Sequence, residues 1–269
     1  MALNLFKNKY NNYPVLFLHG LAGTLKDWEK TITKISNVYY EMRFFDREKI
    51  YHNYFGDNKE KRFWNLSYYS MNLLDDSLYG NLNIFALRLK KMIDKILFMT
   101  KQDKVVIIAH SMGGLISRRY MVLNQDCWNS VYKILTVATP HRGFGISLGV
   151  IQQLRDLKRN SKFITKLDEK WNNFYDKNRD KKWGVVGAID VKAGYSIEND
   201  PNATDSGGIG FVEISSSIPY DEWKDAISNN IEKESYDTQN FGFRIAVKAN
   251  HTSVMLSEGV FKGIAWAMK

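Results

Sequence analysis

The sequence has a single cysteine and no long apolar run, and each shortage excludes a class of protein. One cysteine, Cys127, among 269 residues forms no intrachain disulfide and no cysteine-based zinc site. No run of 18 apolar residues occurs, so the sequence offers no candidate for a membrane-spanning helix. With 44% hydrophobic and 25% charged residues, the chain has the composition of a soluble globular protein, which excludes disordered and collagen-like chains.

The sequence also lacks a concentrated basic patch, although it is basic overall. Its 38 lysines and arginines exceed its 29 acidic residues, which gives a formal charge of +9. Such an excess favours nucleic acid or an anionic surface as a partner. Acidic residues nevertheless alternate with the basic ones in 57–62 and 179–182, and no basic-aromatic RNA motif occurs. We therefore expect no nucleic-acid partner.

The start of the chain lacks the pattern of a signal peptide. Residues 1–10 contain no basic stretch followed by an apolar core. We expect a cytoplasmic protein, with secretion of a trimmed mature form left open. Because α/β architectures often reach about 250 residues as one unit, we predict a single domain over residues 1–269.

Short apolar segments alternate with longer amphipathic ones, as in strands joined by helices around a mostly parallel sheet. We predict four strands that end at polar or glycine-rich turns and two weaker ones: 15–18, 105–109, 134–138 and 243–247, then 66–69 and 183–189. Helical periodicity is clear over 84–100, and a second helix is expected after Ser111. Residues 46–61 are predicted to be a surface excursion. The fold class is α/β, and ligands are expected beyond the carboxyl ends of the strands.

Residues 143–182 depart from this alternation and predict a helical cap inserted in the domain. The segment carries two helical stripes, Leu148/Ile151/Leu154/Leu157 and Phe163/Leu167/Trp171. Its apolar faces either cover the site as a lid or form permanent core, and both alternatives stay open.

The strongest motif is Ala109-His110-Ser111-Met112-Gly113, which lies between a predicted strand and a predicted helix. A serine between small residues at such a turn is a nucleophile elbow. The turn raises the serine Oγ above the sheet, and the helix start places the Met112 N–H where a developing oxyanion is stabilised. We predict Ser111 as a nucleophile and Met112 as an oxyanion donor.

A serine nucleophile needs a histidine base and an acid that orients it. In the α/β-hydrolase order of serine, acid and histidine, three of the five histidines come too early in the chain. His141 follows Ser111, but the only acidic residue between them is Asp126, at the predicted end of a helix. His251, in the loop after the last predicted strand, is therefore the predicted base.

The acid is expected in a turn after the penultimate strand, where four carboxylates lie: Asp190, Glu198, Asp200 and Asp205. Asp190 directly follows the predicted strand 183–189. Asp205 lies in the glycine-rich segment 204–212, a turn suited to holding a side chain in a fixed position.

An early motif, His19-Gly20-Leu21-Ala22-Gly23, follows the first strand, and its glycines allow the Leu21 N–H to serve as the second oxyanion donor.

These motifs resemble those of α/β-hydrolases of the bacterial lipase and acyl-esterase type. The resemblance rests on four segments: His19 to Gly23, Ala109 to Leu115, Thr139-Pro140-His141-Arg142-Gly143 and Asn250-His251. It implies a nucleophile at Ser111, a base at His251 and oxyanion donors at Leu21 and Met112. Asp205 to Val212 with Ser215-Ser216 resembles the family's acid motif apart from three extra residues, 206–208, so Asp205 is the preferred acid.

The resemblance implies a serine carboxylic-ester hydrolase, lipase-like, that works through an acyl-enzyme and needs no metal or organic cofactor. The expected partner is a small-molecule or lipid ester. We also expect transient contact between the cap and a lipid surface, and the +9 charge of the chain would favour a surface that is anionic. Alternatives are a thioesterase, an amidase or an acyltransferase of the same fold. A catalytically silent binding module is the alternative from a different class.

Overall fold

A computed structural model describes most of the chain, and the ranges are these: residue 6, 10–44, 49–55, 61–71, 76, 80–144, 151–178, 180–190, 203–205, 212–228 and 231–269. Within these residues, nine strands form one sheet in the order β3-β2-β4-β1-β5-β6-β7-β9-β8. The inner strands run parallel to one another, and only the outermost pairs, β2–β3 and β8–β9, are antiparallel. The predicted mostly parallel α/β fold is confirmed.

The bounds of the strands are β1 Val15–Leu18, β2 Tyr39–Phe44, β3 Ile50–Phe55, β4 Phe63–Ser70, β5 Val105–His110, β6 Val131–Val137, β7 Trp183–Ile189, β8 Ser235–Tyr236 and β9 Phe243–Lys248. Those of the helices are α2 Lys26–Thr33, α4 Leu82–Thr100, α5 Met112–Met121, α6 Gln125–Asn129, α7 Gln152–Asp156, α8 Lys162–Asn178, α9 Ile214–Ser217, α10 Glu222–Ser228, η2 Ser253–Leu256 and α11 Glu258–Met268. None of the helices in this part of the chain is long and apolar enough to cross a membrane.

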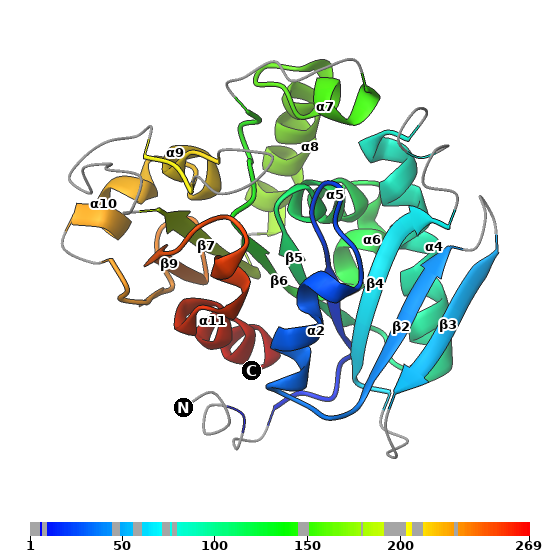
Figure 1. Cartoon of the computed structure of the whole chain (residues 1–269). Coiled ribbons are helices and arrows are strands. Elements are labelled where there is room, and N and C mark those ends of the chain that lie inside the picture. Colours follow the sequence, from blue (N-terminus) through cyan, green and yellow to red (C-terminus); the bar gives the residue numbers. More distant parts are fainter. Residues whose placement is uncertain are drawn as a thin grey trace.

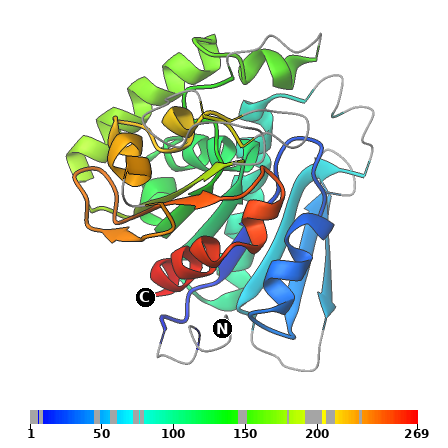
Figure 2. The ribbon, with the colours of Figure 1, turned by 60° about the vertical axis from the view of Figure 1, so that its left-hand side comes forward.

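Helices cover both faces of the sheet and create two apolar cores. Helices α2 and α11 lie on one face and α4, α5 and α6 on the other (Figures 1 and 2). Strand β1 shows why two cores form, because its alternate residues are buried on opposite sides. Leu16 and Leu18 belong to the cluster with α4 and α5, whereas Val15 and Phe17 belong to the cluster with α2 and α11. Side chains buried on both faces explain the continuous apolar segments of the sequence.

The sheet extends further than the sequence predicts. Residues 46–61 were expected to be a surface excursion, but β3 forms within them and pairs antiparallel with β2. The prediction is wrong because an edge strand needs only one partner, and exposed polar residues such as His52 and Asn53 hide its pattern. Strands β2 and β8 and helices α2 and α11 were not predicted.

The segment 143–182 contains α7 and α8, which Figure 1 shows above the sheet. Leu148, from the first predicted stripe, lies outside the described residues. The second stripe is buried: Phe163, Leu167 and Trp171 are 8%, 1% and 0% exposed and join the core cluster of α4 and α5. The Trp171 ring packs 5.3 Å from that of Trp128. The second stripe is therefore core, and a lid role for the segment stays a prediction.

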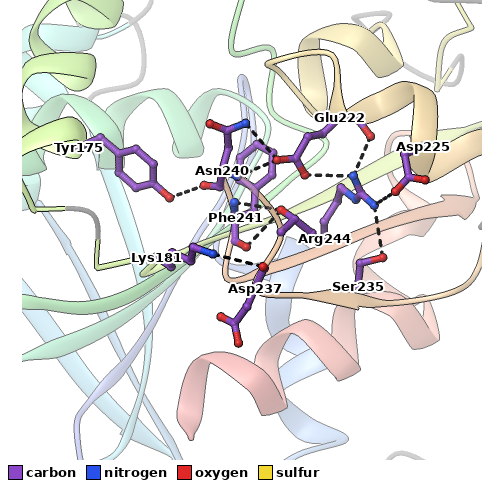
Figure 3. Close-up of polar contacts among 10 residues, drawn as sticks. Tyr175, Lys181, Glu222, Asp225, Ser235, Asp237, Asn240, Phe241 and Arg244 are labelled. Atoms are coloured by element: carbon purple, nitrogen blue, oxygen red, sulfur yellow. Dashed lines mark hydrogen bonds and ion pairs between the residues drawn. The ribbon is translucent and has the colours of Figure 1, made fainter.

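A polar cluster around Arg244 stabilises the edge of the sheet formed by β8 and β9. Arg244, at the start of β9 and 4% exposed, donates from Nη1 to a carboxylate oxygen of Glu222 at 3.0 Å and to the Glu222 carbonyl at 3.1 Å (Figure 3). Its Nη2 donates to the Asp225 carboxylate and to Ser235 Oγ. The Glu222 carboxylate also accepts from the backbone N–H of Asn240 at 2.7 Å. These contacts tie α10 to β8 and β9.

Candidate active site

Ser111 forms the turn between β5 and α5 in a backbone conformation that only a constrained residue adopts. Its φ of 51° and ψ of −125° lie where glycine is favoured. The turn is held by the Ser111 N–H, which donates to the carbonyl of Val137 at 2.9 Å, and by the Gly114 N–H, which donates to the Ser111 carbonyl at 3.0 Å. This is the strained strand-to-helix geometry expected of a nucleophile elbow.

The glycines after Ser111 are required by close packing. A Cβ atom on Gly113 would lie 2.5 Å from the carbonyl oxygen of His19, and one on Gly114 would lie 2.2 Å from Thr139 Oγ1. The loop 19–23 and the turn after β6 that contains Thr139 therefore contact the elbow directly. Gly20 is also tightly packed, because a Cβ atom on it would lie 2.9 Å from the Ser111 Cβ. The sequence motifs around residues 20, 111 and 139 meet at this point.

His251 and Asp205 form a pair in which the aspartate is buried and the histidine is 13% exposed. His251 Nδ1 lies 2.6 Å from Asp205 Oδ2, and the His251 N–H donates to the Asp205 carbonyl at 2.9 Å. The other carboxylate oxygen, Oδ1, accepts the Val212 N–H at 2.8 Å. Asp205 is 1% exposed, and burial raises the pKa of its carboxyl, while the bonds from His251 and Val212 act to lower it. A carboxylate on Nδ1 selects the tautomer whose Nε2 accepts a proton.

Asp190 is the other predicted acid that lies within the described residues. Asp190 follows β7, and its N–H donates to the Thr204 carbonyl at 3.0 Å. Glu198 and Asp200 lie outside the described residues. Asp205 is a candidate whose carboxylate the structure places against the imidazole of His251.

Ser111, His251 and Leu21 line one cavity of about 660 Å³, together with His110 and Phe144. The cavity lies at the carboxyl ends of β1 and β5, where the polar turns were expected to meet. Met112, the other oxyanion candidate, is fully buried as the first residue of α5, directly after Ser111. The N–H groups of a helix's first turn lack intrahelical partners and favour negative charge. The cavity therefore brings Ser111 and His251 to the same space.

His19, which the sequence analysis set aside as a base, supports the loop instead. Its Nδ1–H donates to the Gly20 carbonyl at 2.9 Å, and its Nε2 accepts from the Ser67 hydroxyl at 2.9 Å. Burial lowers the pKa of His19 to about 4, so the ring is neutral at pH 7. His19 comes directly before the turn, and that adjacency is the signal that could have revealed its role.

His110 lies against the candidate base. Its Nε2–H donates to the His251 carbonyl at 2.8 Å, and the two rings are 4.6 Å apart. Burial, with the neighbouring His251 as the next cause, holds the pKa of His110 well below its usual value. The residue before Ser111 therefore contacts the loop after β9, which sequence position alone does not show.

His141 is a core residue. It is 1% exposed, its Nε2 lies 3.0 Å from Thr136 Oγ1, and its Nδ1 lies 3.2 Å from Arg118. Its ring meets that of Trp183 edge-on at 4.9 Å. The motif around Thr139 to Gly143 thus braces β6 and α5. Within the described part of the chain, no group of three histidine, cysteine or acidic side chains is placed to hold a metal ion.

The sheet order, the elbow and the acid–histidine pair are those of an α/β-hydrolase fold. Residues 9–224 match the PGAP1-like alpha/beta domain, and the chain belongs to that family.

Curated relatives are longer proteins named GPI inositol-deacylase. The one from Coccidioides immitis is 28% identical over 136 residues, which are 48% of this chain and 12% of that protein. The one from Eremothecium gossypii is 30% identical over 134 residues, 48% of this chain and 13% of that protein. The matched region is thus a small part of each relative.

Solved structures share the fold at low identity. A Listeria innocua gene product superposes with a TM-score of 0.55 at 11% identity, covering 96% of this chain and 94% of that one. A mature Bacillus licheniformis lipase gives 0.53 at 14% identity over 94% and 91% of the two chains. These likenesses support the α/β-hydrolase fold.

Proposed function

We propose that this chain is a serine hydrolase of carboxylic esters that works through an acyl-enzyme. The observation that carries the proposal is the 2.6 Å contact between Asp205 and His251. It lies beside a cavity that also holds the strained Ser111. Histidine–carboxylate pairs occur elsewhere in proteins, but one next to a nucleophile elbow has a specific chemical use.

In the proposed reaction, Ser111 Oγ bonds to the acyl carbon as His251 Nε2 takes the hydroxyl proton. The carbonyl oxygen becomes an oxyanion, which the N–H groups of Leu21 and Met112 stabilise. Collapse breaks the ester bond, and the alcohol leaves with the proton that His251 returns. A water molecule then repeats the sequence on the acyl-enzyme, with His251 as its base. Asp205 holds the Nδ1–H tautomer throughout.

The name of the relatives, GPI inositol-deacylase, favours an acyl ester on a polyol as the substrate class. Phe144 adds an apolar wall to the cavity and is itself fixed by the segment that follows it. Its N–H donates to the Leu157 carbonyl at 2.7 Å, and its carbonyl accepts the Arg159 N–H at 2.8 Å. We propose that this part of segment 143–182 borders the acyl chain. We further propose that segment 143–182 acts as a lid that opens at a lipid surface.

A fluorophosphonate probe tests the nucleophile directly, because it phosphonylates only an activated serine. We expect labelling of the purified chain at Ser111, found by mass spectrometry of the peptide, and none in Ser111→Ala. A panel of p-nitrophenyl esters from acetate to palmitate, with one thioester and one amide, then separates esterase from thioesterase and amidase activity. Absence of labelling and of turnover on every substrate would favour a silent binding module.

A further inference from the structure

The Gly20–Leu21 peptide is held through its carbonyl oxygen by side chains that the reaction described above does not use. The hydroxyl of Tyr68 lies 2.9 Å from the Gly20 oxygen and 2.9 Å from the His19 oxygen. The Nδ1–H of His19 donates to the same Gly20 oxygen. Tyr68, from β4, is fully buried, and its ring packs 4.4 Å from that of His19. Two donors thus converge on one peptide oxygen.

The next residue of β4 holds the loop on the other side of Leu21. The hydroxyl of Tyr69 accepts the Ala22 N–H at 3.3 Å and donates its own proton to Gln153 Oε1 at 2.9 Å. Gln153, in α7, is 2% exposed. Ala22 itself has a φ of 54°, where a residue with a Cβ is strained. A conformation of this kind persists only where its surroundings fix it.

We propose that Tyr68 and Tyr69 are positioning residues for the oxyanion hole. In a trans peptide the carbonyl and the N–H point in opposite directions, and the described residues contain no cis bond. Fixing the Gly20 oxygen toward Tyr68 therefore turns the Leu21 N–H away from β4. Gly20 packs against the Ser111 side chain, and in this proposal the Leu21 N–H points toward the oxygen of an acyl group bonded to Ser111. Holding Ala22 as well prevents the Leu21 peptides from rotating.

This role rests on the proposed function and deepens it, since it assigns the aim of one oxyanion donor to two hydroxyl groups. It also connects α7 to the loop, because Gln153 orients the Tyr69 hydroxyl so that a lone pair meets the Ala22 N–H. Removing either hydroxyl leaves both rings in place against His19 and lets the loop turn. The transition state loses stabilisation, whereas the ground-state ester, which needs no oxyanion donor, binds as before.

The test uses Tyr68→Phe and Tyr69→Phe in the full chain, with p-nitrophenyl butyrate as substrate. We expect kcat to fall about tenfold to hundredfold, as for a modest misplacement of a catalytic group, with KM within about twofold. The inhibition constant of a trifluoromethyl ketone, which forms an oxyanion on Ser111, should rise in parallel. The pH profile of kcat/KM should keep its shape, because the His251 contacts are unchanged.

Tyr120→Phe is the matched control. Tyr120 is 1% exposed, and its hydroxyl lies 2.7 Å from Ser130 Oγ, so it also loses a buried hydrogen bond. Tyr120→Phe should keep the wild-type kcat, while its melting temperature falls about as much as those of Tyr68→Phe and Tyr69→Phe. If both loop variants keep kcat within twofold of Tyr120→Phe, the positioning role is wrong. Should Tyr68→Phe fail to fold, Tyr69→Phe alone decides. An inactive wild type would reject the proposed function too, whereas an active wild type with unaffected variants rejects only this role.

Discussion

The two ends of strand β9 carry polar clusters that are used differently. At its start, the Arg244 guanidinium contacts two carboxylates, a carbonyl and a hydroxyl, and it is not among the residues that line the cavity of Ser111 (Figure 3). Beyond its end, His251 binds Asp205 through one ring nitrogen and lines the cavity of Ser111. An ion pair enclosed by protein holds elements together, whereas a pair with one side at a cavity can exchange a proton. The same strand therefore separates a structural cluster from a candidate catalytic one.

The largest effect should come from breaking the cavity end. Asp205→Asn would present an amide to His251 Nδ1 and favour the wrong tautomer, so we expect kcat to fall by about 10³ to 10⁴. Stability should change by no more than about 1 kcal/mol, because the amide has the same shape and removes a buried charge. Ester turnover and a urea melt on the same sample measure both.

Asp190→Asn is the comparison variant, with an expected loss in kcat below about tenfold, since Asp190 lies outside the cavity contacts described above. The reverse order of the two losses would transfer the orienting role to Asp190.

The Arg244 end should show the opposite behaviour. Arg244→Ala leaves the Glu222 side chain, 10% exposed, without its cation, and breaking a buried pair costs about 3 to 5 kcal/mol of stability. Turnover per folded molecule should stay within about twofold of wild type, because the described contacts of Arg244 join α10 to β8 and β9 and not to the cavity of Ser111. Arg244→Lys keeps the charge without the forked geometry of the guanidinium, so its stability should lie between those of wild type and Arg244→Ala. A large loss of kcat with normal stability would mean that the two ends are coupled.

Acid should act on the cavity end through its neutral histidines. His19 has a pKa lowered from 6.5 to about 4 by burial, so the unfolded chain binds this proton more readily than the folded one. Stability is therefore complete above pH 6.5 and declines as the pH falls toward about 4. His110 and His141, also buried with lowered pKa values, act in the same direction.

His19→Asn isolates the contribution of one ring, because the amide nitrogen replaces the Nδ1 donor to Gly20 without titrating. Between pH 7 and pH 5 the variant should lose about 2 kcal/mol less stability than wild type. Urea melts at the two pH values measure this difference. Buried carboxyls with raised pKa values, such as Asp205, act in the opposite direction but do so equally in both proteins. Equal losses in the two proteins would contradict a neutral His19.

Much of the fold was predictable because it depends on local patterns. Strands β1, β5 and β6 are buried on both faces and therefore appear as continuous apolar runs that end at polar turns. The edge strands escaped because one-sided pairing tolerates exposed polar side chains, as β3 shows. The second stripe of segment 143–182 gave a correct helix, but its burial against Trp128 depends on a partner that is distant in sequence.

The candidate site was predictable as a set of motifs and only partly as a geometry. The elbow motif is local, since Ser111 and its small neighbours are consecutive in the sequence. The contacts of Gly113 with His19 and of Gly114 with Thr139, which require these glycines, are not local. The acid is not local: four carboxylates lie in the region expected after the penultimate strand, and the contact of Asp205 with His251 appears only once the chain is folded. Tyr68 and Tyr69 were missed for the same reason. They lie on β4 about 50 residues from the loop that they hold, so no spacing rule connects them.

The smallest effect should come from the exposed member of the Arg244 cluster. Asp225 and Glu222 bind the same guanidinium, yet Asp225 is 64% exposed and Glu222 only 10%. Water and salt screen an exposed pair, so Asp225→Asn should cost less than about 1 kcal/mol, and part of that loss should vanish in about 0.5 M KCl. Glu222→Gln removes a charge that water cannot replace, and we expect it to cost about 1.5 to 3 kcal/mol with little salt dependence. Urea melts at low and high salt compare the two variants. An Asp225→Asn loss as large as that of Glu222→Gln would show that the guanidinium geometry, and not burial, sets the strength of this end of the strand.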